Sequence, residues 1–237
     1  MKYFVLIGLL CLIAIPTHAD QLFKVGLIEN GRSPYFKQDE NGDLSGIYIR
    51  LIKEIAKKLN YHVEFHHLPQ PRIRLYMEHG ELNLEPGISP RWRKRSQEKL
   101  SSVYSIPFME SHEVIIHRPN TSIDTTRIPA SLQTLKGCSL LGFDQLPGTK
   151  KNKLVQTEKQ LLKLIDIGRC DYAIMPKRVF HHFDLPEYHL THTKPILTFK
   201  LHLRLHKSQQ AIVPKINNII NELKESGRLE NIINTQY

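Results

Sequence analysis

The stretch KVGLIENGRSPYFKQDENGDLSGIYIRLIKEIAKKLNYHVEF, residues 24–65, contains a strand, a turn-rich loop, an amphipathic helix and a second strand. Apolar and other residues alternate over residues 23–28, which predicts a strand, and the run from Asn30 to Pro34 breaks it into a loop. From Ile47 the apolar residues recur on one helical face, and Asn60 is suited to a left-handed helix cap. A strand, a helix and a strand in this order predict a parallel sheet.

The same alternation continues after this stretch. Residues 72–79 predict a second helix that ends at Gly80, and a third strand is expected to begin at Leu82. The fold class is therefore predicted to be α/β.

The first nineteen residues have the pattern of a secretion signal. Lys2 is followed by an apolar run over residues 4–15 and by the small-residue ending at Ala19. The run is shorter than the ~20 residues that an uncleaved membrane anchor needs. We therefore expect residues 1–19 to be removed and the rest of the chain to be periplasmic.

The composition is basic throughout. The 237 residues contain 33 Lys and Arg against 23 Asp and Glu, a formal net charge of +10, and the positive charges are spread along the chain. Such a balance suits an anionic solute or an acidic envelope polymer, or reflects solubility alone. Nucleic acid is not an expected partner, because the chain is expected outside the cytoplasm and has no recognition motif.

Further segments, in the same order along the chain, carry a resemblance to a known family. They are MEHGELNLEPGISPRWRKR, SSVYSIPFMES, LKGCSLLGF, QLLKLIDIGRCDYAIM and INNIINELKESGRLENI. Together with residues 24–65, they resemble the family 3 extracellular solute-binding proteins of bacterial ABC importers. Each motif is short, but the shared order spans nearly the whole chain after residue 19.

The resemblance implies a two-lobed α/β clamp of the type II periplasmic binding protein kind. Each lobe would be a mostly parallel sheet flanked by helices, with the second lobe shortened. Lobe 1 would comprise residues 20–111 plus 196–237 and lobe 2 residues 112–195, with crossings at residues 116–119 and 192–195. A small solute would bind between the lobes of a monomer, and an ABC permease or a membrane sensor would be the partner.

The resemblance also implies a carboxylate-binding arginine in the segment from Ser89 to Arg93. A planar guanidinium matches a carboxylate in a bidentate fork. The family's spacing places Trp92 at the arginine position, so Arg93 is the favoured fork and Arg91 the alternative. A third interpretation is that these arginines form a solvated basic helix face.

Other candidate binding residues lie in the loops of lobe 1. The first loop offers Glu29, Arg32 and Tyr35, where the family places polar and aromatic side chains against the solute. Arg72 is a further candidate for the same cleft. The alternative for all four is an ordinary surface position.

Lobe 2 departs from the family pattern. Amino-acid binders in the family place an aspartate after the strand that corresponds to residues 172–175, but here Pro176 and Lys177 follow. A missing ammonium partner and a lysine argue against a standard α-amino acid and favour an acidic or otherwise modified solute. Together with the resemblance, this gives a small polar solute that is anionic or zwitterionic and amino-acid-like as the expected ligand. The segment after Thr149 is also short, so Thr149 is a weaker candidate for a ligand contact.

Two cysteines of lobe 2 are candidates for a disulfide. On the family's template Cys138 opens one strand, Cys170 precedes another, and the two strands are neighbours, which suits a disulfide in an oxidising compartment. Two buried thiols are the alternative.

We expect neither a cofactor nor a metal. The 13 histidines show no compact ligand spacing, and no nucleophile motif is present. A non-enzymatic binding protein is therefore predicted, with a sensor or envelope-binding module of the same fold as one alternative. The other is an exported cyclohexadienyl-type dehydratase, for which Glu29 and Glu85 are the candidate general acids.

Overall fold

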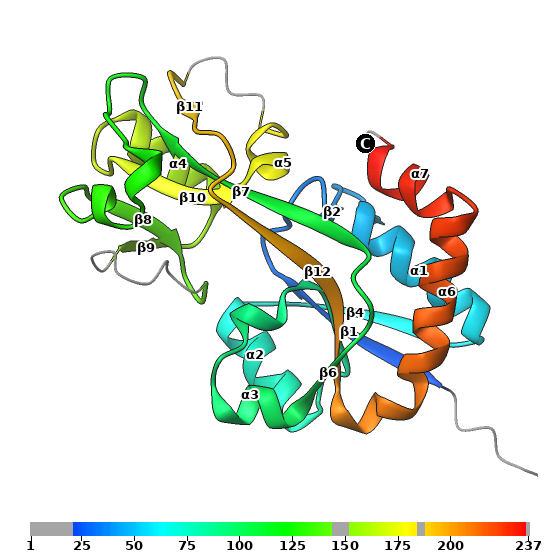
Figure 1. Cartoon of the computed structure of the whole chain (residues 1–237). Helices are drawn as coiled ribbons and strands as arrows, with labels where there is room; N and C mark the ends of the chain where they lie inside the picture. The colour runs from blue at the N-terminus through cyan, green and yellow to red at the C-terminus, as the bar shows by residue number, and fades with distance from the viewer. Residues whose placement is uncertain (1–20, 144–151, 184–187, 236–237) are drawn as a thin grey trace, which may run out of the picture.

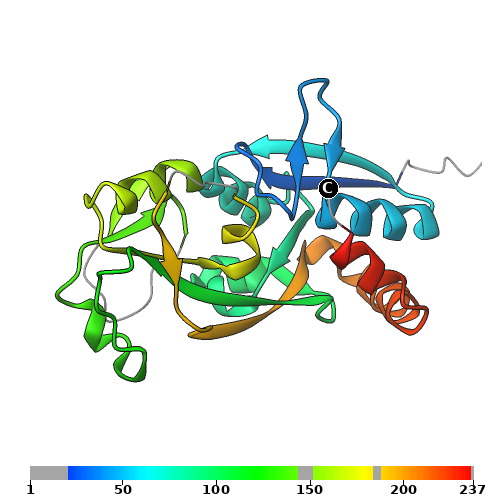
Figure 2. The ribbon, with the colours of Figure 1, turned by 90° about the horizontal axis from the view of Figure 1, so that it is seen from above.

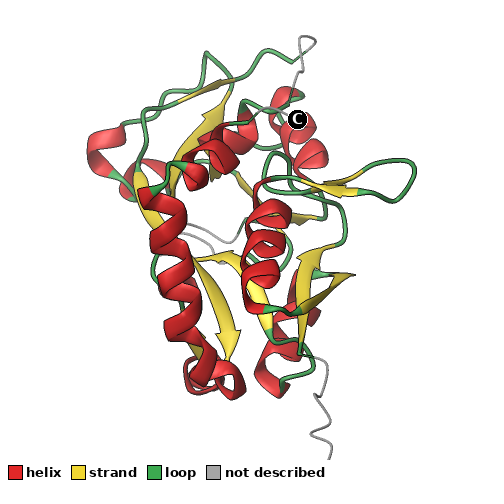
Figure 3. Ribbon diagram, turned by 90° about the vertical axis from the view of Figure 1, so that its right-hand side faces the viewer, coloured by secondary structure: helices red, strands yellow, loops and turns green. Residues whose placement is uncertain are grey.

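The computed structural model describes residues 21–143, 152–183 and 188–235. These residues form a ten-stranded mixed sheet in the order β4-β1-β5-β12-β7-β10-β8-β9, with β6 paired to β12 and β11 to β7. Helices pack alongside the strands in both halves of the molecule (Figure 3), which confirms the predicted α/β fold. Within the described ranges, no helix combines the length and apolar character needed to cross a bilayer. The expected signal peptide lies outside them.

The first lobe combines segments from both ends of the chain. In it β1 runs parallel to β4 and β5, and β12 is antiparallel to β5. Its elements are β1 Leu22–Ile28, β2 Lys37–Gln38, β3 Leu44–Ser45, α1 Ile47–Leu59, β4 His62–Leu68, α2 Gln70–His79, β5 Leu84–Ile88, a 3₁₀ turn Pro90–Trp92, α3 Ser96–Ser101, β6 Ser102–Tyr104, β12 Leu197–His206, a 3₁₀ turn Lys207–Ile212, α6 Val213–Glu225 and α7 Arg228–Asn234.

The second lobe is the middle of the chain. Its strand β10 is parallel to β8 and antiparallel to β7, and β9 is parallel to β8 at the edge. Its elements are β7 Met109–His117, 3₁₀ turns Thr125–Arg127 and Ala130–Leu132, β8 Gly137–Leu140, β9 Lys153–Val155, α4 Glu158–Asp166, β10 Tyr172–Pro176, α5 Lys177–Phe180 and β11 Thr191–His192.

Two long strands, β7 and β12, join the lobes. They pair antiparallel from Met109 opposite Leu201 to Glu113 opposite Leu197, and they run side by side between the lobes in Figure 1. Beyond Glu113, β7 pairs with β10 of the second lobe. The crossing pair is thus residues 109–113 with 197–201, nearer the first lobe than the sequence indicated, because β7 continues beyond Glu113 to pair with β10 and β11. The lobe boundaries themselves stay a prediction.

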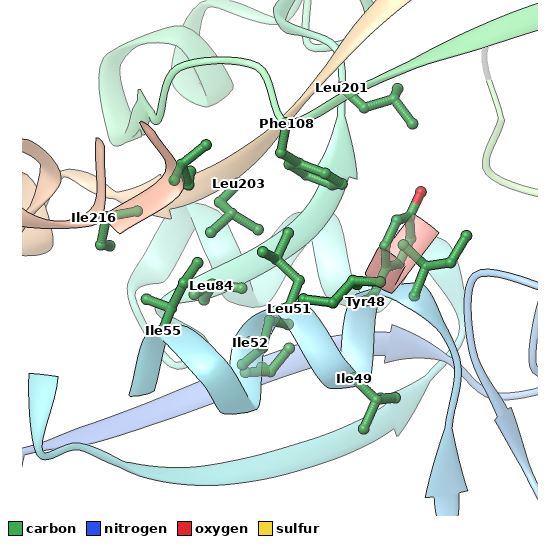
Figure 4. Packing of buried hydrophobic residues seen from close by; sticks show 14 of the residues in the cluster. Tyr48, Ile49, Leu51, Ile52, Ile55, Leu84, Phe108, Leu201, Leu203 and Ile216 are labelled. Atoms are coloured by element: carbon green, nitrogen blue, oxygen red, sulfur yellow. The ribbon is translucent and has the colours of Figure 1, made fainter. Parts of the chain in front are cut away.

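Helix α1 shows why the opening stretch folds as predicted. A side chain on Gly46 would put a Cβ 2.5 Å from the Tyr35 carbonyl oxygen, so the helix begins where only glycine fits. Asn60 ends it in the left-handed conformation, and its N–H donates to the Ala56 carbonyl. The apolar face of α1 meets side chains of β5, β12 and α6 (Figure 4), and α6 and α7 lie beside it (Figure 2).

The second lobe has its own core around a disulfide. Cys138 and Cys170 are bonded with Cα atoms 5.9 Å apart, and Cys138 pairs with Ala173 of β10, as expected from neighbouring parallel strands. Both cysteines are buried among apolar side chains of β7, β8, α4 and β10. The bond therefore ties β8 to the turn between α4 and β10.

Replacing both Cys138 and Cys170 by Ser should destabilise the protein by about 3 to 4 kcal/mol, because the bond closes a loop with a sequence separation of 32. Urea unfolding followed by circular dichroism measures the loss. Reductant should lower the stability of the unaltered protein and leave the double variant unchanged. Equal stability of the two proteins without reductant would contradict the role assigned to the bond.

Candidate ligand-binding site

A cavity of about 360 Å³ lies between the two lobes. Its lining includes the carboxyl ends of β1, β5, β8 and β10 with the loops that follow them, and both crossing strands contribute. Ligands of open α/β sheets bind outside the carboxyl ends of strands. The cavity is therefore the candidate site, and its volume is within the range for small-molecule sites.

Four of the predicted site residues lie together in this lining: Arg32, Arg91, Trp92 and Arg93. Glu29 and Arg72 are exposed and are not among the lining residues. Tyr35 and Ser89 are buried, but they too lie outside the lining. Lys177 lines a separate hollow on the α5 side, so it does not point to an anion in the cavity. Thr149 falls outside the described residues.

Arg32 links the lobes across the cavity. Its Nε donates to Glu158 Oε1 at 2.9 Å, and its guanidinium lies 4.8 Å from the centre of the Phe143 ring. Glu158 is the first residue of α4, beside the Thr157 cap. Burial alone would lower the pKa of Arg32, but the charge of Glu158 raises it above its usual value, so the pair is ionic.

Arg93, the favoured carboxylate fork, is only 5 % exposed and is turned toward a buried glutamate. Its Nη2 donates to Glu85 Oε1 at 2.6 Å, and Arg204 Nη1 donates to Glu85 Oε2 at 2.8 Å. Burial tends to raise the pKa of Glu85, but the two arginines lower it below its usual value. The fork of Arg93 is thus engaged within lobe 1, because a buried carboxylate needs cationic partners.

A second buried carboxylate, Glu98, extends this network at the start of α3. Arg74 donates to both of its oxygens, at 2.7 and 2.8 Å, and Arg95 Nε lies 3.3 Å from Glu98 Oε2. Burial opposes ionisation, but these hydrogen bonds and charges lower the pKa of Glu98 to about 2. Arg93 therefore lies between two buried carboxylates, with its Nη2 2.6 Å from Glu85 Oε1 and its Nε 3.8 Å from Glu98 Oε1.

Arg91 and Trp92 are presented to the cavity on Phe199 of β12. The Arg91 guanidinium lies 5.5 Å from the centre of the Phe199 ring, and the Trp92 ring lies 5.1 Å from it in an edge-on arrangement. Arg91 is exposed and has no ion pair among the residues that the structure describes. Within residues 89–93, Arg91 is therefore the arginine whose guanidinium can bind a ligand carboxylate.

Tyr48 forms part of the cavity wall and was not predicted. Its ring stacks on Tyr35 with centroids 4.9 Å apart. A Cβ added to Gly87 would lie only 2.0 Å from the Tyr48 hydroxyl oxygen. Burial raises the pKa of Tyr48 well above its usual value, so the hydroxyl stays neutral. Glycine at residue 87 is needed for this close approach.

The sequence reasoning also missed the acidic partners Glu158 and Glu113 and the buried Arg204. Arg204 occupies the polar phase of the alternating pattern LHLRLH at residues 201–206, and Glu158 stands in the polar run QTEKQ at residues 156–160, so the sequence gives no local signal that either is buried. Arg204 is 0 % exposed, so the face that it shares with His202 is internal. In the part of the chain that is described, no three His, Cys, Asp or Glu side chains are grouped to hold a metal ion.

The chain belongs to the bacterial extracellular solute-binding proteins, family 3, whose model matches residues 24–236. Solved structures share the fold. The substrate-binding protein of an amino acid ABC transporter is 17 % identical, with 90 % of this chain and 97 % of that chain covered and a TM-score of 0.74.

Two other structures are similar to the same extent. A histidine kinase sensor domain is 18 % identical, with 89 % and 93 % covered and a TM-score of 0.72. The ancestral amino acid-binding protein AncCDT-1, a precursor of cyclohexadienyl dehydratase, is 19 % identical, with 89 % and 92 % covered and a TM-score of 0.72. At these identities the likeness shows the fold alone. No curated protein sequence matches the chain.

Replacing Glu98 by Gln should flatten the acid dependence of stability. The folded pKa of about 2 lies below the usual 4.5, so the ionised group stabilises the protein above about pH 4.5 and this contribution, at most about 3 kcal/mol, is lost as the pH falls toward 2. Urea midpoints at pH 7, 5 and 3 measure the effect. Glu40→Gln, in an exposed turn, is the matched control, and an acid dependence unchanged by Glu98→Gln would contradict the assignment.

Proposed function

We propose that the protein captures a small, carboxylate-bearing, amino-acid-like solute between its lobes in the periplasm. The observation that carries this proposal is the cavity, whose lining comes from both lobes and from both crossing strands. A solute bound there contacts surfaces that separate when the lobes move apart. Its binding free energy then favours the closed arrangement, as a population shift.

The cavity wall suits a solute with an apolar body and few charges. Phe36, Trp92, Phe143 and Phe199 supply aromatic surface, and Arg91 supplies an open guanidinium. Charged groups that are already paired, such as Arg93 with Glu85, offer less to a ligand than Arg91 does. Arg91 therefore takes the role of carboxylate fork in this proposal.

Contacts across the lobes support closure. Besides Arg32 with Glu158, Arg74 Nη1 donates to the Gly142 carbonyl at 3.3 Å, and Arg178 Nη1 of α5 donates to the Ile233 carbonyl of α7 at 3.1 Å. Each joins a side chain of one lobe to the other. The partner that recognises the closed form would be a membrane permease, with a membrane sensor as the alternative.

The positions of Glu29 and Glu85, the two candidate general acids, argue against the dehydratase alternative. Glu29 is exposed and outside the cavity lining, and Glu85 is held ionised by two arginines. A general acid must carry a proton near neutral pH. Glu85 does not meet this requirement, and Glu29 lies outside the cavity lining.

Changing Arg91 to Ala should weaken solute binding about 10- to 100-fold, the loss of a charge-assisted hydrogen bond pair. The measurement is a thermal-shift screen against amino acids, organic acids, short peptides, sugars and polyamines. A ligand at a hundredfold excess over Kd adds about 2.7 kcal/mol, which shifts Tm by several degrees. Arg169→Ala, exposed on the second lobe, is the control. If no compound of the panel raises the Tm of the unaltered protein, that result would contradict solute capture.

Changing Glu158 to Gln should favour the open arrangement, because it removes the ionic partner of Arg32 across the cavity. The radius of gyration of the solute-free protein in small-angle X-ray scattering should rise. The apparent Kd of any panel compound that binds should rise about 10-fold, since fewer molecules are closed. Glu225→Gln, at the exposed end of α6, should change neither quantity. An unaltered radius and affinity in Glu158→Gln would show that the pair does not hold the lobes together.

A further inference from the structure

Glu113 is a carboxylate placed in the cavity at the hinge. It lies on the crossing strand β7 directly opposite Leu197 of β12, is 8 % exposed, and belongs to the cavity lining. No motif of lobe 1 or lobe 2 nominated it. Its position on a crossing strand means that it keeps its place in the cavity whichever lobe moves.

The partners of Glu113 do not neutralise it. Its Oε1 accepts a hydrogen bond from Ser111 Oγ at 2.6 Å, and across the described ranges no Lys, Arg or His nitrogen lies within 4.0 Å of its carboxylate. Arg32 and His112 act on it only through longer-range attraction. Arg32 donates its Nε to Glu158, so Arg32, Glu158 and Glu113 together leave one negative charge facing the cavity.

A buried carboxylate with a single hydroxyl partner is unfavourable until a cation or further donors reach it. Tyr35 and Tyr48, the other titratable groups near it, have pKa values raised by burial and remain neutral. Burial likewise raises the pKa of Glu113 above its usual value, and a cation that enters through the cavity would offset the cost of ionising it.

We propose that Glu113 binds the protonated amine of the solute and so sets the specificity of the site for ammonium-bearing compounds. This inference rests on the proposed function. The family's usual acidic residue is replaced after β10 by Pro176 and Lys177, and here the acid comes from the crossing strand instead. A compact ammonium with three donors suits a carboxylate whose second oxygen has no hydrogen-bond donor among the described residues.

The geometry also sets the orientation of the solute. Leu197 and Phe199 are two residues apart on β12, so they share a face with Glu113, and Phe199 lies diagonally from Glu113 at roughly 7 to 8 Å between Cα atoms. Arg91 lies over the Phe199 ring. The amine binds at Glu113, the carboxylate at Arg91, and the apolar body lies along Phe199.

Isothermal titration calorimetry with two matched series of probes tests the inference. One series is L-phenylalanine, 2-phenylethylamine and 3-phenylpropanoate; the other is L-leucine, 3-methylbutylamine and 4-methylpentanoate. Within each series the apolar body is the same. The second compound lacks the carboxylate of the amino acid, and the third lacks its amine. We expect amine-bearing members of at least one series to bind, and the matching deaminated acid to bind at least 10-fold more weakly.

Glu113→Gln should weaken binding of the amine-bearing probes about 10- to 100-fold, bringing the amino acid level with its deaminated acid. Glu110→Gln, the same change at an exposed residue of the same strand, should stay within twofold of the unaltered protein. Glu113→Asp keeps the charge, so it should bind more weakly but retain the preference for amines. That variant keeps the inference testable if Glu113→Gln does not fold.

Other outcomes separate this inference from solute capture. A deaminated acid that binds as tightly as its amino acid, in a manner that depends on Arg91, would overturn the role of Glu113 and leave solute capture standing. Turnover of a cyclohexadienyl acid that is lost in Glu113→Gln would make Glu113 a general acid and also overturn the inference. No binding by any probe or by the wider panel would overturn solute capture, and this inference with it.

Discussion

The pairing of β7 with β12 is the constraint on which the rest of the structure depends. It fuses two separately cored lobes into one sheet, because residues 109–113 and 197–201 form a single ladder between them. Hydrogen bonds along a ladder resist stretching but allow the sheet to twist. The part of the cavity formed by this ladder, which we call the floor, is therefore fixed. The walls of the cavity, formed by residues of β5 in the first lobe and β8 in the second, are the parts that can approach or separate. Side chains on the floor are suited to selecting a solute, and side chains on the two walls to sensing that it is bound.

Buried charge decides which arginine faces the cavity. Glu85 and Glu98 lie inside lobe 1, and a carboxylate in that position costs several kcal/mol unless cations surround it. Arg93, Arg204 and Arg74 satisfy that requirement. Arg91, two residues earlier, packs on the Phe199 ring. Trp92 stands where the resemblance implies a carboxylate fork. Of the arginines on either side of it, Arg93 is paired with Glu85 and Arg91 lies on Phe199.

The local features of the fold could be predicted from the sequence because they depend on neighbours in the chain. The apolar face of α1, the left-handed cap at Asn60 and the end of α2 at Gly80 follow from periodicity and from residue type. The disulfide followed once the family's order placed its two strands side by side. The charge network could not be predicted this way, since Glu85 and Arg204 are 119 residues apart and Arg32 and Glu158 are 126 apart. The sequence shows where an arginine lies, but only the folded structure shows whether its guanidinium is already paired with a carboxylate.

The two lobes carry their charges in a complementary way, and this bears on how closure is controlled. Arg32 of lobe 1 and Glu158 of lobe 2 attract each other across the cavity, and neither has much solvent around it when the lobes meet. Such a pair gains Coulomb energy on closing but loses hydration, so the net effect of the intact pair is small, whereas removing one partner leaves the other charge unpaired and opposes closure. A solute that excludes the remaining water lowers the local dielectric and strengthens the pair. Burial raises the pKa of Glu113, and the nearby charge of Arg32 opposes this rise. A cation at Glu113 would compensate the charge of Glu113, which the neutral pair of Arg32 and Glu158 does not offset. Solute recognition at the floor and attraction between the walls are then coupled through the same three side chains, which links closure to the identity of the solute.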